Sequence, residues 1–296
     1  MRRSLIIAVM LLCFGNMVQG QETCATQALK SGEMTKTLQV GERERTYIRY
    51  VPETNHAEPL PLVLVFHGFA SNAPEMVELT GFNLIADQEK FVVIYLQGTN
   101  NPAQWYNGTN LFLPQDDLRD MDFVTAVLDK YTMSPCIDAE RVYATGFSMG
   151  GGMVHRLACE MSDRFAAYAT VSGAYATIPN GCQPERGISL LTIHGLADPV
   201  VPFEGAGVFL PNIEDWLADW VARNDCQVST PLPSLGDVTG TSYSDCKDNS
   251  TIEIYTIPDG GHTWAGTTML NRASAMGGIV SSDINASEVI WAFFEG

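Results

Sequence analysis

A serine at position 148 stands between two glycines in the run Gly146-Phe147-Ser148-Met149-Gly150. The residues before this run are apolar, β-branched or aromatic, which is typical of a buried strand, and apolar residues at helical spacing follow it. Strand, sharp turn and helix are the context of a nucleophile elbow, in which a strained turn exposes the serine hydroxyl. Glycine-rich turns with a chance serine also match the pattern, so the flanking elements carry the prediction that Ser148 is a nucleophile.

Serine is a weak nucleophile unless a neighbouring base takes its proton, and histidine is the usual base. The chain has five histidines, His56, His67, His155, His194 and His262. His67 and His194 each end a predicted strand before a glycine, where shaping a loop is the expected role. His155 lies on the helix that follows the serine, and His56 lies in a polar loop. His262, in a loop after the last predicted strand, is therefore the candidate base.

A carboxylate should orient the base, and it should precede the histidine in the chain order Ser, Asp, His. Asp198 stands just beyond the predicted strand Ser189–Ile193, where a side chain can reach a site at the carboxyl end of the sheet. Its alternative role is a turn residue before Pro199. Asp259 is a rival, but it lies so close to His262 that capping the local turn suits it better. We expect Asp198 to hold the imidazole and stabilise the imidazolium.

Two backbone N–H groups should stabilise the oxyanion that forms when the serine attacks a carbonyl group. One is expected from Met149, the residue after the nucleophile. The other is expected from the loop after His67-Gly68, most simply from Phe69.

Two tryptophans are candidate substrate-binding residues. Trp264 follows His262 by two positions, and Trp105 lies in the long loop after the predicted strand Phe91–Leu96. If both side chains line the site, they would flank an acyl pocket and stack on planar or sugar rings. Ordinary packing is the alternative for each.

Buried strands alternate with helices along most of the chain. The predicted strands are an early hairpin, Lys36–Val40 with Thr46–Val51, followed by Leu62–Phe66, Phe91–Leu96, the run ending at the elbow, Tyr168–Val171, Ser189–Ile193 and Thr251–Ile257. The predicted helices are Gly81–Lys90, Asp120–Tyr131, the helix after Ser148, one over Ile213–Val221, and a last one that Asn285 and Glu288 open as a capping box. This alternation predicts the α/β class, with a mostly parallel sheet covered by helices on both faces.

Residues 1–20 have the pattern of a signal peptide, with Arg2 and Arg3 before an apolar stretch. A membrane anchor is the alternative. The remaining residues, 21–296, are expected to form one catalytic domain, because no linker or repeat divides them. The net charge of −17 becomes −19 without the two leader arginines, which argues against nucleic acid and anionic surfaces as partners.

Six cysteines follow the leader, an even number that favours disulfides in an exported chain. Six cysteines allow about 15 pairings. The predicted pairs, from the elements beside each cysteine, are Cys159–Cys182, Cys226–Cys246 and Cys24–Cys136. Free thiols are the alternative in a reducing compartment. Without a Cys-x-x-Cys or a cysteine–histidine cluster, no metal site is predicted. Three glycosylation sequons occur, at Asn107, Asn249 and Asn285.

The mature chain resembles secreted esterases of the polyhydroxybutyrate depolymerase and feruloyl esterase group, the LpqC-like proteins. The matching segments are Leu64–Gly68, Arg141–Gly151, Ile193–Gly195 with Asp198–Pro202, and Gly260–Trp264. The resemblance implies an α/β-hydrolase fold, a triad of Ser148, Asp198 and His262, and ester hydrolysis without a cofactor. Ala265 departs from the proline usual after the tryptophan, which puts the finer substrate preference in doubt.

The leading hypothesis is an exported or periplasmic serine esterase that acts as a monomer through an acyl-enzyme. The alternatives are a noncatalytic binding protein on the same scaffold and a serine peptidase. Feruloyl or acetyl esters of plant polysaccharide and hydroxybutyrate polyesters remain open as substrates. No nucleic acid, and no membrane after removal of the leader, is expected as a partner.

Overall fold

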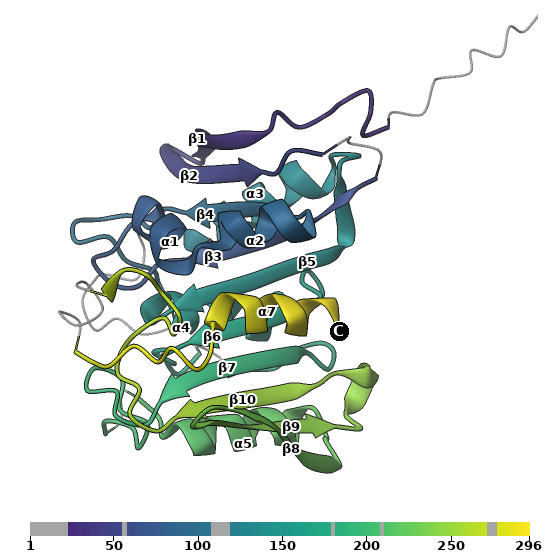
Figure 1. Ribbon diagram of the computed structural model, residues 1–296. Helices are drawn as coiled ribbons and strands as arrows, with labels where there is room; N and C mark the ends of the chain where they lie inside the picture. The colour runs from purple at the N-terminus through teal and green to yellow at the C-terminus, as the bar shows by residue number, and fades with distance from the viewer. Residues whose placement is uncertain (1–22, 55–57, 108–118, 179–180, 208–209, 271–276) are drawn as a thin grey trace, which may run out of the picture.

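The computed structural model describes residues 23–54, 58–107, 119–178, 181–207, 210–270 and 277–296. Its centre is a ten-stranded sheet in the order β1-β2-β4-β3-β5-β6-β7-β10-β9-β8 (Figure 1). The strands are β1 (Gly32–Val40), β2 (Arg43–Val51), β3 (Leu60–Phe66), β4 (Val92–Leu96), β5 (Ile137–Phe147), β6 (Ala167–Val171), β7 (Ser189–Gly195), β8 (Val228–Leu235), β9 (Val238–Ser244) and β10 (Ile252–Ile257).

Six neighbouring strands, from β4 to β10 in the sheet order, run parallel. Every residue of β3, β4 and β6 is buried, because helices cover both faces of this part of the sheet. Their continuous apolar sequences therefore match their surroundings, and all the predicted central strands are confirmed.

Antiparallel strands close both edges of the sheet. β1 and β2 form the predicted hairpin, with Val40 opposite Arg43. At the other edge, β9 joins β10 and β8 joins β9. The sequence analysis missed β8 and β9. Pro231 and Pro233 lie in β8, where proline is tolerated only because the strand is at an edge.

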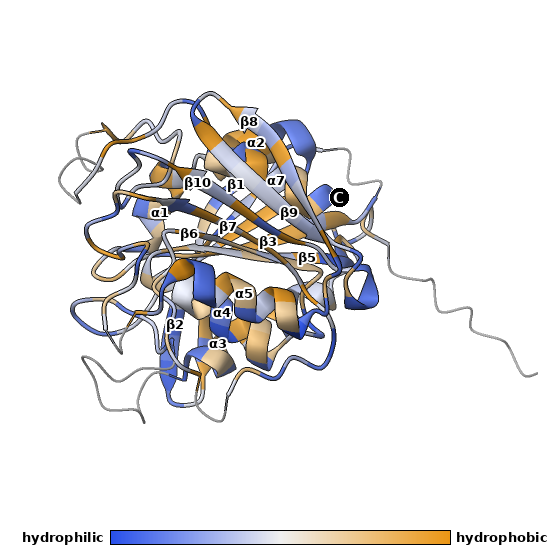
Figure 2. Ribbon diagram, turned by 90° about the horizontal axis from the view of Figure 1, so that it is seen from below, coloured by the Kyte–Doolittle hydropathy of each residue, from blue (hydrophilic) through white to orange (hydrophobic). Residues whose placement is uncertain are grey.

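The helices form two layers. Figure 2 shows α3 (Asp120–Thr132), α4 (Met149–Glu160) and α5 (Ile213–Arg223) on one side of the sheet, and α1 (Ala73–Thr80), α2 (Phe82–Glu89) and α7 (Ala286–Glu295) on the other. Each layer buries its own apolar core against the sheet. A short 3₁₀ helix, Lys247–Asn249, precedes β10. The arrangement confirms the predicted fold class, although α1 was not predicted.

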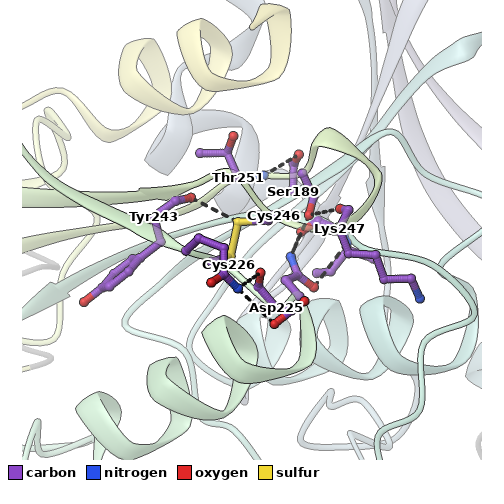
Figure 3. Close-up of a disulfide and its surroundings, with 11 residues drawn as sticks. Ser189, Asp225, Cys226, Tyr243, Cys246, Lys247 and Thr251 are labelled. Carbon is purple, nitrogen blue, oxygen red and sulfur yellow. Dashed lines mark hydrogen bonds between the residues drawn. A yellow bond between two sulfur atoms is a disulfide. The ribbon is translucent and has the colours of Figure 1, made fainter.

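Three disulfides join the predicted partners: Cys24 with Cys136, Cys159 with Cys182, and Cys226 with Cys246. Figure 3 shows Cys226, just after α5, bonded to Cys246 beyond the end of β9. This bond attaches a helix of one layer to the antiparallel edge of the sheet.

The three sequons differ in their surroundings. Asn107 is buried and donates its Nδ2–H to the Ala174 carbonyl. Asn285 caps α7, because its Oδ1 accepts the N–H groups of Ser287 and Glu288. Only Asn249 is an exposed asparagine among these three.

The predicted leader, residues 1–20, lies outside the described residues. Within the described part of the chain, no helix is long and apolar enough to cross a membrane.

Candidate active site

Ser148 lies between β5 and α4, in the turn that the sequence predicts. Its φ of 55° and ψ of −119° are unusual for a residue with a side chain. The turn is held by backbone hydrogen bonds: Ser148 N–H donates to Val171 O, and Ser148 O accepts from Gly152 N–H and Ala174 N–H. The strain of this conformation is thus supported by β6 and α4.

The two flanking glycines are required by close backbone contacts. A Cβ on Gly146 would collide with the Gly150 carbonyl, and a Cβ on Gly150 would collide with the Phe66 carbonyl at the end of β3. Any side chain at either position would push α4 away from the sheet, so the spacing of the motif follows from how closely the helix approaches the strands.

The serine lies at the point where the strand order reverses. From β3 the sheet continues to β4 on one side and to β5 on the other. The loops that follow β3 and β5 are therefore neighbours at the carboxyl edge, where ligands bind in open α/β sheets. The loop after β3 reaches the serine, because a Cβ on Gly68 would lie 3.2 Å from the Ser148 Cβ.

Asp198 and His262 meet at the same edge, although 64 residues separate them. His262 Nδ1 lies 2.8 Å from Asp198 Oδ2, and both side chains are almost completely buried. The other carboxylate oxygen, Oδ1, accepts the N–H groups of Val200 at 2.9 Å and Val201 at 2.8 Å. Asp198 thus orders the turn around Pro199 and also orients the histidine. Its rival Asp259 is exposed.

Two backbone hydrogen bonds dock the loop of the aspartate against the loop of the histidine. Leu196 N–H donates to Ile257 O at 2.9 Å, and Ala197 N–H donates to Gly260 O at 3.0 Å. A side chain at Gly195 would collide with the Gly260 carbonyl. The parallel pairing of β7 with β10 therefore continues into the loops and sets the distance between the carboxylate and the imidazole.

Burial alone would raise the pKa of the Asp198 carboxyl. The hydrogen bond to His262, the attraction of an imidazolium and the N–H groups of Val201 and Val200 outweigh burial, so the pKa of Asp198 is held below its ordinary value. The group is therefore an anion at neutral pH, as an orienting carboxylate must be.

Ser148 and His262 line one cavity of about 370 Å³. The ring of Phe147, the residue before the serine, lies 4.8 Å from the imidazole ring. The described contacts include no hydrogen bond between the Ser148 hydroxyl and the imidazole; such bonds are often long without substrate. A larger groove, about 680 Å³ between α5 and β9–β10, contains no residue of the predicted triad.

The predicted oxyanion residues lie on either side of the serine. Met149 is the first residue of α4, where backbone N–H groups have no acceptor within the helix. Phe69 lines the cavity beside Gly68. His67 fixes this loop, because its Nδ1 lies 2.7 Å from Gly68 O while its Nε2 accepts Gly98 N–H at 2.8 Å.

Trp105 does not line the cavity, which differs from its predicted contact with substrate. Its side chain is buried and donates Nε1–H to the His67 carbonyl at 2.9 Å. Its backbone N–H lies 3.5 Å from the Met149 sulfur. The residue therefore contacts both segments that carry the predicted oxyanion donors, from behind the cavity.

A buried ion pair fixes the segment around Trp105. Arg45 Nη2 lies 2.8 Å from Asp120 Oδ1, and both side chains are almost fully buried. The second oxygen of Asp120 accepts the N–H of Tyr106 at 2.8 Å. The position of the Trp105 loop is thus set by β2 and by the start of α3.

Trp264 is also buried and absent from the cavity lining. Its Nε1–H donates to Ser287 Oγ at 2.9 Å, and Ser287 Oγ–H donates to Thr80 O at 2.6 Å. The ring attaches the His262 loop to α7 and α1, so its position is that of a support and not the predicted substrate contact.

Two further histidines have the packing roles expected of them. His194 donates Nε2–H to Val201 O at 2.9 Å, and burial lowers its pKa. His155 lies among three aromatic rings, and burial lowers its pKa to about 3. His56 lies outside the described residues.

Sequence reasoning missed the rest of the cavity wall. Its other lining residues are Ser71, Glu75, Leu79, Val200 and Met269. Glu75 and Leu79 lie four residues apart on one face of α1, a helix too short to give a clear periodic signal. Among the described residues, no group of three acidic, histidine or cysteine side chains could hold a metal ion.

Residues 45–182 match the family model described as "Esterase PHB depolymerase". The chain is 32% identical over 245 residues to "Putative esterase NocK" of Nocardia uniformis subsp. tsuyamanensis, covering 74% of this chain and 70% of that protein. It is 31% identical to "Probable feruloyl esterase C" of Aspergillus flavus, covering 74% and 76%. The solved structure of an acetyl xylan esterase from Aspergillus awamori has a similar fold, with a TM-score of 0.56 and 17% identity over 82% of this chain and 98% of that one.

Proposed function

The chain belongs to the esterase family of polyhydroxybutyrate depolymerase and is a carboxylic ester hydrolase; from this premise we propose that Ser148, His262 and Asp198 are its catalytic triad. The observation that carries the proposal is the 2.8 Å contact of His262 Nδ1 with a buried aspartate, in a cavity that also contains the strained serine. A carboxylate-held imidazole beside an exposed hydroxyl is what acyl transfer to serine requires.

In the first half of the reaction, the Ser148 hydroxyl oxygen attacks the ester carbonyl carbon while its proton passes to His262 Nε2. Asp198 keeps the proton on Nδ1 and stabilises the imidazolium. The backbone N–H groups of Met149 and Phe69 receive the oxyanion. Each such donor contributes about 3–4 kcal/mol to stabilisation of the transition state. Collapse of the intermediate transfers the Nε2 proton to the departing alcohol and leaves an acyl-serine.

In the second half, a water molecule gives one proton to His262 Nε2 and adds to the acyl carbonyl at the same oxyanion site. Collapse breaks the bond to the serine, and the imidazolium returns its proton to the Ser148 oxygen. The products are the carboxylic acid and the free enzyme. No step needs a cofactor.

The proposed substrates are esters of plant polysaccharide, and aryl esters suit the cavity best. The apolar residues Phe69, Leu79 and Phe147 line the cavity. Its volume of about 370 Å³ lies within the usual range for ligand pockets. The disulfides and the predicted leader support export, with residues 21–296 acting as one catalytic domain and as a monomer.

Initial rates on methyl ferulate, acetylated xylan, hydroxybutyrate oligomers and a peptide, measured in one assay, test the proposal. The expected result is hydrolysis of esters only, with methyl ferulate fastest. Turnover of the peptide, or no turnover of any ester, would contradict it.

A further inference from the structure

His194 places a second imidazole beside the carboxylate that orients the proposed base. His194 Nε2 lies 3.6 Å from Asp198 Oδ2, the same oxygen that His262 Nδ1 contacts at 2.8 Å. The side chains of His194 and Asp198 are fully buried. A separation of 3.6 Å is too long for a hydrogen bond, but two charges at this distance in a buried site would interact strongly. The protonation state of His194 therefore affects the charge that Asp198 presents to His262.

The hydrogen bond of His194 fixes the position of its proton. Nε2 lies 2.9 Å from the Val201 carbonyl oxygen, which can only accept, so Nε2 carries a hydrogen. The other ring nitrogen, Nδ1, is buried and has no hydrogen-bond partner among the described residues. A second proton, on Nδ1, would thus have no acceptor there.

The charges around the ring lead to the same state. Burial lowers the pKa of His194 and outweighs the Val201 carbonyl and the Asp198 carboxylate, which raise it. A protonated His262 lowers this pKa further, by repulsion. His194 is therefore a neutral hydrogen-bond donor.

Val201 connects this donor to the aspartate. Its C=O accepts from His194 Nε2–H, and its N–H donates to Asp198 Oδ1 at 2.8 Å. Val201 is buried, so water does not readily replace either bond. His194 belongs to β7, whereas Asp198 and Val201 belong to the turn that follows this strand. The bond from His194 thus attaches the turn of the aspartate to the sheet.

We propose that His194 is a positioning residue of the triad: as a neutral donor it holds Val201, and through Val201 it holds the Asp198 carboxylate at His262. This inference rests on the proposed function. A protonated His194 would itself attract Asp198 Oδ2 and compete with His262 for the carboxylate. The neutral state is therefore part of the role, because it fixes the carboxylate without taking its charge.

Two substitutions separate the donor from the ring. His194→Gln keeps an N–H donor near the position of Nε2, whereas His194→Leu has no donor. The measurements are kcat, KM and the pH profile of kcat/KM on a 4-nitrophenyl ester, with active sites counted by fluorophosphonate titration. In His194→Leu, kcat should fall by about tenfold or more, and KM should change by about threefold or less.

The acid limb of the profile reports the protonation of His262. In His194→Leu it should move to lower pH by about one unit, because an imidazole farther from a carboxylate is protonated less easily. His194→Gln should keep the acid limb of the wild type and a kcat within about threefold of it.

His155→Leu is the matched control. His155 is also a buried imidazole with a lowered pKa, but its described contacts are aromatic rings and Cys159. This variant should keep the acid limb of the wild type, and thermal unfolding sets an assay temperature at which every variant is folded. A fall of kcat in His194→Leu without a shift of the acid limb would overturn the proposal. Equal losses in His194→Gln and His194→Leu would do the same, because general packing explains both results.

The wild type supplies a test that needs no substitution. Long-range ¹H–¹⁵N NMR spectra of the protein with ¹⁵N-labelled histidine distinguish the neutral Nε2–H tautomer from the imidazolium. His194 should keep this tautomer throughout the pH range in which His262 titrates. Protonation of His194 in that range would overturn the proposal even if His194→Leu does not fold. Full activity of Asp198→Asn would instead refute the triad of the proposed function.

Discussion

His67 and His262 both follow strands that end at the carboxyl edge of the sheet, but their surroundings differ. At His67, both ring nitrogens contact backbone groups, of Gly68 and Gly98. Burial lowers the pKa of His67 to about 4, so its ring stays neutral. At His262, one nitrogen contacts the Asp198 carboxylate and the ring lines the cavity. His262, which has a carboxylate partner and access to the cavity, is placed to act as the base. His67, whose ring nitrogens both contact backbone groups, is placed to hold its loop.

The two sides of the cavity are therefore built differently. On the oxyanion side, backbone hydrogen bonds through His67 and Trp105 hold the loop of Phe69. On the base side, one charged contact orients a ring whose proton must move. Removing the charge of Asp198 should thus abolish catalysis, whereas removing one hydrogen bond that holds the loop of Phe69 should only weaken it.

Asp198→Asn should have the largest effect of any single change on the base side. The amide oxygen can still accept the N–H groups of Val200 and Val201, but the imidazole loses its tautomer control and its stabilising charge. We expect kcat to fall by about 10⁴ while the fold persists. Rates on a 4-nitrophenyl ester with circular dichroism measure both quantities. A fall of less than about tenfold would remove Asp198 from the triad.

Trp105→Phe should have a smaller, purely catalytic effect on the oxyanion side. The variant keeps an aromatic ring but leaves the His67 carbonyl without its donor. Because the loop that carries Phe69 then moves, we expect kcat to fall by about 10- to 100-fold. This fall is smaller than the one expected when an oxyanion donor is removed altogether. KM should change by about threefold or less.

Trp216→Phe is the matched control for that variant, since it removes an indole N–H that bonds His155 outside the cavity. Its kcat should stay that of the wild type. If Trp105→Phe raises KM and spares kcat, Trp105 instead contacts substrate, as the sequence first suggested.

Neutral buried histidines should make the protein sensitive to acid. Below about pH 6.5, the unfolded chain protonates His155, whereas the folded chain takes up this proton only near its lowered pKa of about 3. The free energy of unfolding therefore decreases as the pH falls through this window, by up to about 1.4 kcal/mol per pH unit for each such residue. Urea unfolding at pH 7 and pH 5 should show a smaller difference in His155→Gln than in the wild type. An unchanged difference would contradict a neutral, buried His155.

Trp264→Phe should have the smallest effect. Losing the indole hydrogen bond to Ser287 should lower the free energy of unfolding by about 1–2 kcal/mol. Because the ring does not line the cavity, the ratio of kcat/KM between a cinnamoyl and an acetyl ester should not change. A selective loss on the cinnamoyl ester would restore Trp264 as a substrate contact.

Residues with strong local patterns were predictable from the sequence. A pattern of about ten residues is enough to predict the elbow, the strand ends that precede Asp198 and His262, and the amphipathic helix α5. The orientation of a side chain cannot be predicted from such a pattern. The positions of Trp105 and Trp264 in the chain therefore suggested a substrate contact that their burial does not support. No sequence pattern predicted that Glu75 lines the cavity, because its place there depends on how the short helix α1 packs beside β3 and the loop after it.

The central claim is that Ser148 forms the acyl-enzyme with His262 as its base. A fluorophosphonate probe, followed by peptide mapping, tests this most directly in the wild type, Ser148→Ala and Asp198→Asn. We predict one label per wild-type chain on the peptide containing Ser148, none in Ser148→Ala, and labelling of Asp198→Asn slowed by at least about a hundredfold. A label on another residue, or ester hydrolysis that persists in Ser148→Ala, would contradict the account.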